Sequence, residues 1–223
     1  MRLHRALWSL TVGLGLFAPI SARAAYLDLV AAPDAGHANS VVLDPSTQVL
    51  TGTDISLTTL FGIGTPNSPG VFFPLADARL DFATAPLTGS DAAGDLFFGA
   101  GGTVTITIAS AGGGVPTGVA FTGQFVGTTE LQKESDGIFR ILAGGFSGTV
   151  SSALANYFGL AAEATSTGAL SLNLGTSGTS FTFLSGDVSV DPNPVPEPSS
   201  LGLIAVGLAA GLYLRRRARV AMG

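Results

Sequence analysis

Short runs in which apolar and polar residues alternate cover most of the chain between residues 25 and 191. The clearest is GGTVTITIAS at residues 101–110, where Val104, Ile106 and Ile108 alternate with threonines. Because successive side chains of a strand point to opposite faces, this alternation predicts a strand with one buried face. Comparable runs rich in β-branched and aromatic residues lie at residues 41–43, 55–61, 79–82, 119–126, 138–142, 146–150, 170–174, 181–184 and 188–190.

The segments between these runs carry residues that favour turns. Asp44-Pro45 and Ser68-Pro69-Gly70 are two of them, and Ser135-Asp136-Gly137 separates two of the predicted strands, which predicts a hairpin. Many short strands with few helical runs are typical of a single all-β domain. We expect an antiparallel β-sandwich or a jelly-roll-like domain rather than a barrel.

One segment has a helical pattern instead. Ser151–Leu160 (SSALANYFGL) begins with serines suited to capping, places Leu154 and Phe158 four residues apart, and has Gly159 near its end. The sequence therefore predicts one short helix within the β domain.

The first 24 residues have the layout of a secretory signal peptide. Arg2 and Arg5 precede an apolar stretch at residues 6–18, and the small residues Ala22 and Ala24 follow it. This order predicts export by the general secretion machinery and cleavage after Ala24. The apolar stretch is too short for a membrane anchor.

A second apolar segment lies near the other end of the chain. Residues 201–214 contain no charge, and Arg215, Arg216, Arg217 and Arg219 follow directly. A helix of this length spans about 21 Å, less than the roughly 30 Å of a bilayer core, so Ser199 and Ser200 would have to extend the span. Arginine clusters stay on the cytoplasmic side, which places the domain outside the cytoplasm.

A proline-rich stretch, DPNPVPEP, connects the domain to this segment at residues 191–198. Alternate prolines favour an extended, stiff conformation. The sequence thus divides into a signal peptide at 1–24, a β-rich domain at 25–190, a stalk at 191–198, and a C-terminal helix with an arginine cluster at 199–219.

The order of motifs in the tail resembles the PEP-CTERM sorting signal of exported bacterial proteins. The residues concerned are Pro196, Glu197, Pro198, the apolar helix, and Arg215, Arg216 and Arg217. This resemblance implies that a membrane-embedded processing enzyme, an exosortase, recognises the tail and cuts near the Pro-Glu-Pro box. It also implies a cell-surface or biofilm-matrix protein that associates with extracellular polysaccharide. A permanent single-span anchor is the alternative.

Charge and composition exclude several classes of function. All 15 acidic residues lie between Asp28 and Glu197, where Arg79, Lys133 and Arg140 are the basic residues, so this part carries a net charge of −12. Binding to nucleic acid needs a basic surface and is therefore excluded. The chain has no cysteine, which excludes disulfides and thiolate metal sites.

The sequence predicts no catalytic residues and no cofactor. A Ser-His-Asp site would have to use His37, which we interpret as an exposed loop residue, and no Gly-x-Ser-x-Gly motif occurs. The carboxylate pairs Asp77 with Asp81 and Glu130 with Glu134 have a spacing that places each pair on one strand face. We interpret them as solvated residues, because no aromatic cluster that could bind a sugar accompanies them.

Asp91 and Asp95 are the candidate metal ligands. Both lie in a glycine-containing loop, GSDAAGD, and could offer carboxylate oxygens to calcium, although such aspartates also simply form turns. The sequence therefore favours a non-enzymatic surface or matrix protein. The alternatives are a carbohydrate- or calcium-dependent adhesive module and a secreted glycoside hydrolase.

Overall fold

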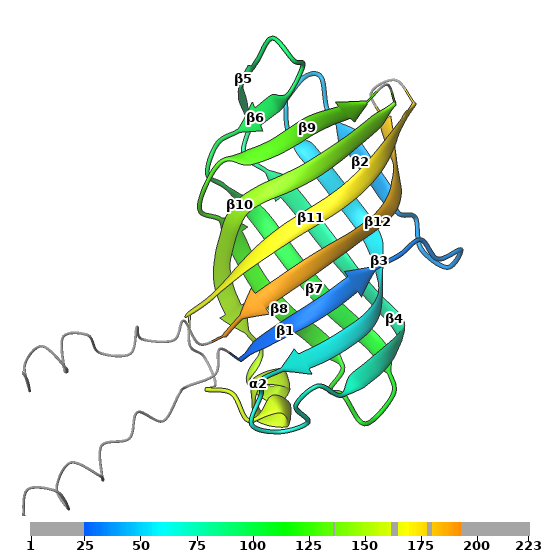
Figure 1. Ribbon diagram of the computed structural model, residues 1–223, viewed down its shortest axis with the longest axis vertical. Coiled ribbons are helices and arrows are strands. Elements are labelled where there is room, and N and C mark those ends of the chain that lie inside the picture. Colours follow the sequence, from blue (N-terminus) through cyan, green and yellow to red (C-terminus); the bar gives the residue numbers. More distant parts are fainter. Residues whose placement is uncertain (1–24, 136, 162–164, 178–179, 193–223) are drawn as a thin grey trace, which may run out of the picture. The chain divides into compact units, whose positions relative to one another are not determined.

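The computed structural model describes residues 25–192 except 136, 162–164 and 178–179, and these form one antiparallel sheet and one short helix (Figure 1). The elements are β1 Tyr26–Ala31, β2 Ser40–Leu43, β3 Leu50–Ile63, β4 Phe72–Thr84, β5 Leu87–Ser90, β6 Leu96–Phe98, β7 Gly101–Ala111, β8 Gly118–Phe125, β9 Thr129–Ser135, β10 Ile138–Val150, α2 Ser152–Phe158, β11 Thr165–Ser177 and β12 Ser180–Asp191.

The sheet closes on itself into a barrel. Neighbouring strands pair in the order β1, β3, β4, β7, β8, β10, β11, β12, and β12 pairs again with β1. Leu29 on β1 illustrates the closure, because its Cα is paired with Val188 on one side and with Leu60 on the other. Every one of these pairings is antiparallel.

The 12 strands of the sheet occupy fewer positions around the barrel. Strands β8 and β9 both lie along β10, β8 beside residues 146–150 and β9 beside residues 138–143. In the same way β1 and β2 share the position between β12 and β3. Strands β4 and β5 share one position in the barrel wall, one after the other, and strands β6 and β7 share another. Four shared positions leave eight, and each is antiparallel to the next along the chain, as in an up-and-down barrel.

The structure confirms an antiparallel all-β domain with one short helix, whereas the predicted sandwich or jelly roll is wrong. A β-sandwich and a β-barrel both bury alternate residues of each strand, so the alternation in the sequence does not distinguish a sandwich from a barrel. The hairpin at residues 135–137 is confirmed by the pairing of Ser135 with Ile138. The helix is confirmed as well, with the Ser151 side chain accepting a hydrogen bond from the Leu154 amide and with Gly159 in the left-handed region.

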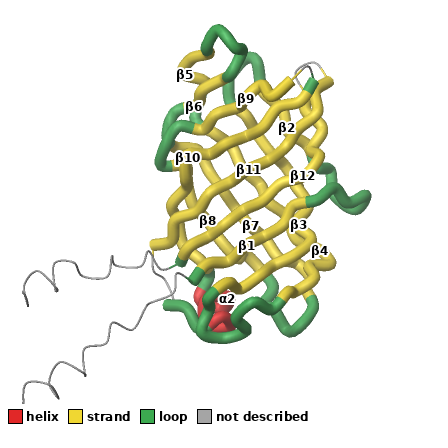
Figure 2. The backbone as a smooth tube through the Cα atoms, viewed as in Figure 1, coloured by secondary structure: helices red, strands yellow, loops and turns green. Residues whose placement is uncertain are grey.

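Apolar side chains fill the interior of the barrel. Val104, Ile106 and Ile108 are at most 1% exposed, as the alternation predicts. The largest fully buried side chains include Phe98, Phe121, Phe125, Phe146, Phe158 and Phe183. Helix α2 lies at one end of the barrel (Figure 2), where the ring of Phe158 contacts the ring of Phe73 with centroids 5.7 Å apart. The core therefore extends from the barrel wall to the helix.

Glycines in the wall make room for the aromatic rings. Gly168 on β11 is paired with Phe146 on β10, and Gly52 on β3 is paired with Phe82 on β4. A Cβ atom at either glycine would overlap the ring of its partner. Small residues opposite large ones are how a narrow barrel accommodates bulky side chains.

In the part of the chain that the structure describes, no helix has the length and hydropathy needed to cross a bilayer. The predicted signal peptide and the predicted segment at 199–219 lie outside these residues, so both stay predictions.

Replacing Gly168 with alanine tests the fit of these rings. We expect Gly168→Ala to lower the free energy of unfolding by about 1–3 kcal/mol, as overpacking of a filled core does. Gly89→Ala is the matched control, because a Cβ there meets no atom within 4 Å. Urea unfolding monitored by circular dichroism measures both variants. Equal stability of the two would contradict the fit described here.

Candidate functional site

The residues of the predicted sorting signal and signal cleavage site lie outside the described part of the chain. They are Pro196, Glu197, Pro198, Arg215, Arg216 and Arg217, together with Ala22 and Ala24. The candidate sites that the structure does place are on the loops and the outer wall of the barrel.

Asp91 and Asp95, the candidate calcium ligands, lie in the hairpin between β5 and β6. Asp91 Oδ1 accepts hydrogen bonds from the amides of Ala93 and Asp95, at 2.9 and 3.0 Å. Asp95 is buried, and its Oδ1 accepts a hydrogen bond of 2.7 Å from the Lys133 amide on β9. Both carboxylates thus fix the hairpin, and calcium binding stays a prediction. Among the described residues, no group of three or more metal-ligating side chains could hold a metal ion.

His37 lies in the loop between β1 and β2, and its predicted exposure is wrong. Its side chain is only 9% exposed, with Nδ1 2.7 Å from Asp54 Oδ1 and Nε2 3.8 Å from Asp77 Oδ1. Asp54 comes from β3 and Asp77 from β4. The imidazole therefore lies between two carboxylates that the strands position, which sequence spacing alone does not reveal.

Asp54 holds this loop against the barrel. It has a positive φ of 54° within β3, where the pairing register with β4 shifts. Its Oδ2 accepts a hydrogen bond of 2.7 Å from the Ala38 amide, and its own amide donates to Asp81 Oδ1 at 2.8 Å. The hydrogen bonds from the Ala38 amide and the His37 imidazole hold the pKa of Asp54 below its ordinary value of 3.8. The sequence signal for Asp54 is a charged residue inside a run of β-forming residues.

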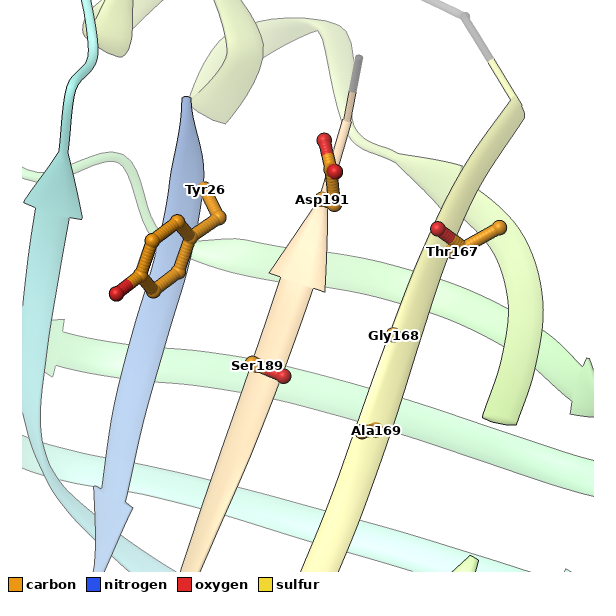
Figure 3. A pocket seen from close by; sticks show the side chains of 6 residues that line it. All are labelled: Tyr26, Thr167, Gly168, Ala169, Ser189 and Asp191. Carbon is orange, nitrogen blue, oxygen red and sulfur yellow. The ribbon is translucent and has the colours of Figure 1, made fainter. Parts of the chain in front are cut away.

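A hollow of about 360 Å³ lies on the outer wall, across β1, β12 and β11 (Figure 3). Tyr26 and Thr167 stand on its two sides, and Ser189 and Asp191 lie between them. The remaining lining residues are Gly168 and Ala169. The space exists because the residues between the tyrosine ring and Thr167 are small.

Two further carboxyl groups lie beside this hollow. Asp28 on β1 is paired with Ser189, and Val30 is paired with Asp187, so Asp28 and Asp187 are on the same pair of strands. Burial, a hydrogen bond with Asp187 and the charge of Asp187 raise the pKa of Asp28 from 3.8 to about 6. The strands β1, β11 and β12 contain these two aspartates and Asp191, and no lysine, arginine or histidine.

Comparison with known proteins identifies the tail. Residues 194–217 match the family model described as the PEP-CTERM protein-sorting motif. No curated protein and no solved structure matches the chain. The predicted resemblance is therefore confirmed, and the motif indicates an exported protein that an exosortase processes at the membrane. The match covers the tail and carries no information about the barrel.

Substitution of Asp54 tests how the loop at residues 32–39 is held. We expect Asp54→Asn to reduce stability by about 1 kcal/mol at pH 7, because it removes a charged acceptor of two hydrogen bonds. Since the pKa of Asp54 is lowered by folding, its stabilisation is present above pH 3.8 and is lost as the pH falls further. The difference between the two proteins should thus shrink at pH 3. Urea unfolding at both pH values measures it, with Glu130→Gln as control, because no ion pair of Glu130 is found among the described residues. A pH-independent difference would contradict the role of this charge.

Asp28 should have the opposite pH dependence. Its pKa is raised by folding, so its contribution is fully present below about pH 3.8 and is lost as the pH rises through about 6. Asparagine does not titrate. The free energy of unfolding of Asp28→Asn, relative to that of the native protein, should therefore be about 1 kcal/mol higher at pH 8 than at pH 4. This value is reduced for solvent screening. Thermal unfolding at the two pH values tests this, and Glu130→Gln should show no such gain.

Proposed function

We propose that this protein is a non-enzymatic component of the cell surface or extracellular matrix. It is exported by the general secretion machinery, held in the inner membrane by its C-terminal segment with the barrel outside the cytoplasm, and processed by an exosortase. The observation that carries the proposal is the sorting motif at residues 194–217.

The position of the motif relative to the barrel supports processing. Strand β12 ends at Asp191, and the matched motif begins only three residues later. A cut near the Pro-Glu-Pro box would therefore remove no strand, and the barrel would keep every pairing of β12. The alternate prolines favour an extended backbone that a protease can accept.

The filled interior supports a role other than catalysis. A barrel of about eight strands either holds one small ligand or is filled by its own side chains, and here buried phenylalanine, leucine and isoleucine side chains of the described residues occupy the interior. Binding chemistry is therefore confined to the outer wall and the loops.

The polar side chains of the outer wall support the proposed association with hydrated polysaccharide. Thr105, Thr122, Thr149 and Thr165 are paired directly with one another across β7, β8, β10 and β11, and the last three are exposed. Their hydroxyl groups offer both donors and acceptors to the hydroxyl groups of a sugar polymer. Such a surface remains compatible with neutral polysaccharide although the domain is acidic.

Mass spectrometry of the C-terminus tests the proposed processing. We expect the protein recovered from the cell surface to lack Arg215–Arg219, whereas replacing Pro196, Glu197 and Pro198 with alanine should leave the tail uncut in the membrane. Asn193→Ala, just before the matched residues, is the control and should be processed normally. An intact tail on the surface protein would favour the permanent anchor instead.

A further inference from the structure

Two neighbouring phenylalanine rings lie on the outer wall of the barrel. Phe61 on β3 is paired with Phe72 on β4, and their ring centroids are 5.5 Å apart. Phe72 is 57% exposed, which is the largest exposed fraction among the large apolar side chains of the described residues. Because its neighbour Phe73 is buried against helix α2, the ring of Phe72 points away from the core.

Three more apolar side chains extend this surface. Val71 precedes Phe72 and is 43% exposed. Tyr26 on β1 is paired with Ile63 on β3, which lies two residues beyond Phe61 and therefore on the same face of the sheet. We call Tyr26, Phe61, Ile63, Val71 and Phe72 the aromatic patch. It lies at the end of the barrel where β1 begins, β12 ends and helix α2 is found (Figure 1).

The connections at this end of the barrel carry no charge. The loop between β3 and β4 contacts α2, because the Asn67 amide donates to the Phe158 carbonyl oxygen at 3.0 Å. The loop between β7 and β8 also contacts it, since the Gly113 carbonyl oxygen accepts a hydrogen bond of 2.6 Å from the Tyr157 hydroxyl. No acidic or basic side chain occurs in the two loops or in and around the helix, at residues 64–71, 112–117 and 151–161.

The charged side chains lie elsewhere on the barrel. Two of them border the aromatic patch: Asp28 is paired with Phe61, and Asp191 lines the hollow beside Tyr26. Many of the others are at the opposite end, in the hairpin of β5 and β6 and on β9, namely Asp91, Asp95, Glu130, Lys133 and Glu134. An acidic surface is repelled by anionic lipid headgroups. The end that carries the aromatic patch is therefore the part of the domain best suited to approach a bilayer.

We propose that the aromatic patch docks on the outer face of the membrane that holds the precursor, with its rings at the level of the lipid headgroups. This inference rests on the proposed retention of the precursor by its C-terminal segment. Aromatic side chains are enriched at this depth of a bilayer, and an apolar surface binds there more strongly the more area it buries. Docking also keeps the Pro-Glu-Pro box close to a membrane-embedded exosortase.

The length of the chain beyond β12 places a bilayer within reach of the patch. Strand β12 ends at Asp191, and the uncharged segment predicted to enter the membrane begins at Leu201. Ten extended residues at 3.1 Å each span about 30 Å. A tether of this length keeps the patch at a high effective concentration near the lipid, but it does not itself impose contact.

A second copy of the chain fits the aromatic patch less well than a bilayer does. A stable protein interface takes about 20–30 residues from each partner, many more than the patch provides. At a bilayer a few rings suffice, because the tether already holds the protein there and the rings only have to orient it.

Quenching of tryptophan fluorescence by brominated lipid tests the docking. Trp8 is the one tryptophan of the chain, so the full chain with Trp8→Phe, produced without an exosortase, provides a silent background. Phe72→Trp adds a reporter to the patch, and Ile138→Trp is the matched control, at a 44% exposed apolar position in the hairpin of β9 and β10. Both are reconstituted in phosphatidylcholine vesicles with or without bromine on the acyl chains.

We expect bromine to lower the fluorescence of Phe72→Trp about two- to threefold and that of Ile138→Trp by less than about a tenth. Equal quenching of the two reporters, or no quenching of Phe72→Trp, would overturn the proposal. An unquenched but blue-shifted Phe72→Trp would show that a second copy of the chain covers the patch, which also overturns it.

A second reporter tests whether the rings cause the contact. With Val71→Trp in place, Phe61→Ser combined with Phe72→Ser should reduce the bromine quenching at least about twofold. Val126→Ser combined with Ile138→Ser is the control, because it removes two exposed apolar side chains from outside the patch and should leave the quenching unchanged. Circular dichroism checks that each variant is folded. Quenching that persists without the two rings would overturn the proposal.

Flotation of the full chain with the same vesicles separates this proposal from the proposed retention. If the chain floats with the vesicles and Phe72→Trp is not quenched, the docking is overturned and the retention stands. If the chain does not float, neither its C-terminal segment nor the aromatic patch binds the bilayer, and both proposals fail.

Discussion

The pairing of β1 with both β12 and β3 is the constraint on which the rest of the structure depends. It removes the free edges that an open sheet would expose, and it fixes the circumference of the barrel. The interior volume is then fixed too, so the core side chains have to fit it. The fit depends on glycines paired with aromatic residues, as with Gly52 and Phe82 and with Gly168 and Phe146. The aromatic ring on one strand occupies the space that a side chain would take at the glycine of the neighbouring strand. The glycine content of the sequence is in part a packing requirement.

A closed, apolar interior moves the polar chemistry of the domain to its outside. The acidic side chains of the barrel either fix a connection or lie on the outer wall. Asp95 accepts from the Lys133 amide and so attaches the hairpin of β5 and β6 to β9, while Asp54 attaches the loop before β2 to β3. Each of these carboxylates stays partly hydrated or hydrogen-bonded, which is how a domain with few basic residues can carry so many acids without burying unpaired charge.

The sequence predicted features that depend on residues close together in the chain, and it did not predict features that depend on residues far apart in the chain. The alternation around Ile106 and the cap residues of α2 follow from neighbouring positions, as does the sorting motif in the tail. Closure follows from pairing the first strand with the last, and no periodicity encodes it. The environment of His37 was missed for the same reason, since its partner Asp54 is 17 residues away on a strand whose register shifts there. The hollow combines three strands from both ends of the domain, so no short motif could have indicated it.

The strands that close the barrel are also the strands next to the two predicted processing sites. Strand β1 follows the predicted signal cleavage site, and β12 precedes the sorting motif, so the seam between them joins the ends of the domain. Pairings between residues this far apart in sequence carry the largest loop-closure entropy cost in the barrel. During export the barrel therefore cannot close until the chain as far as Asp191 has crossed the membrane. Cleavage at the two predicted sites would leave this seam intact, because Ala24 and the Pro-Glu-Pro box both lie outside the residues that form it.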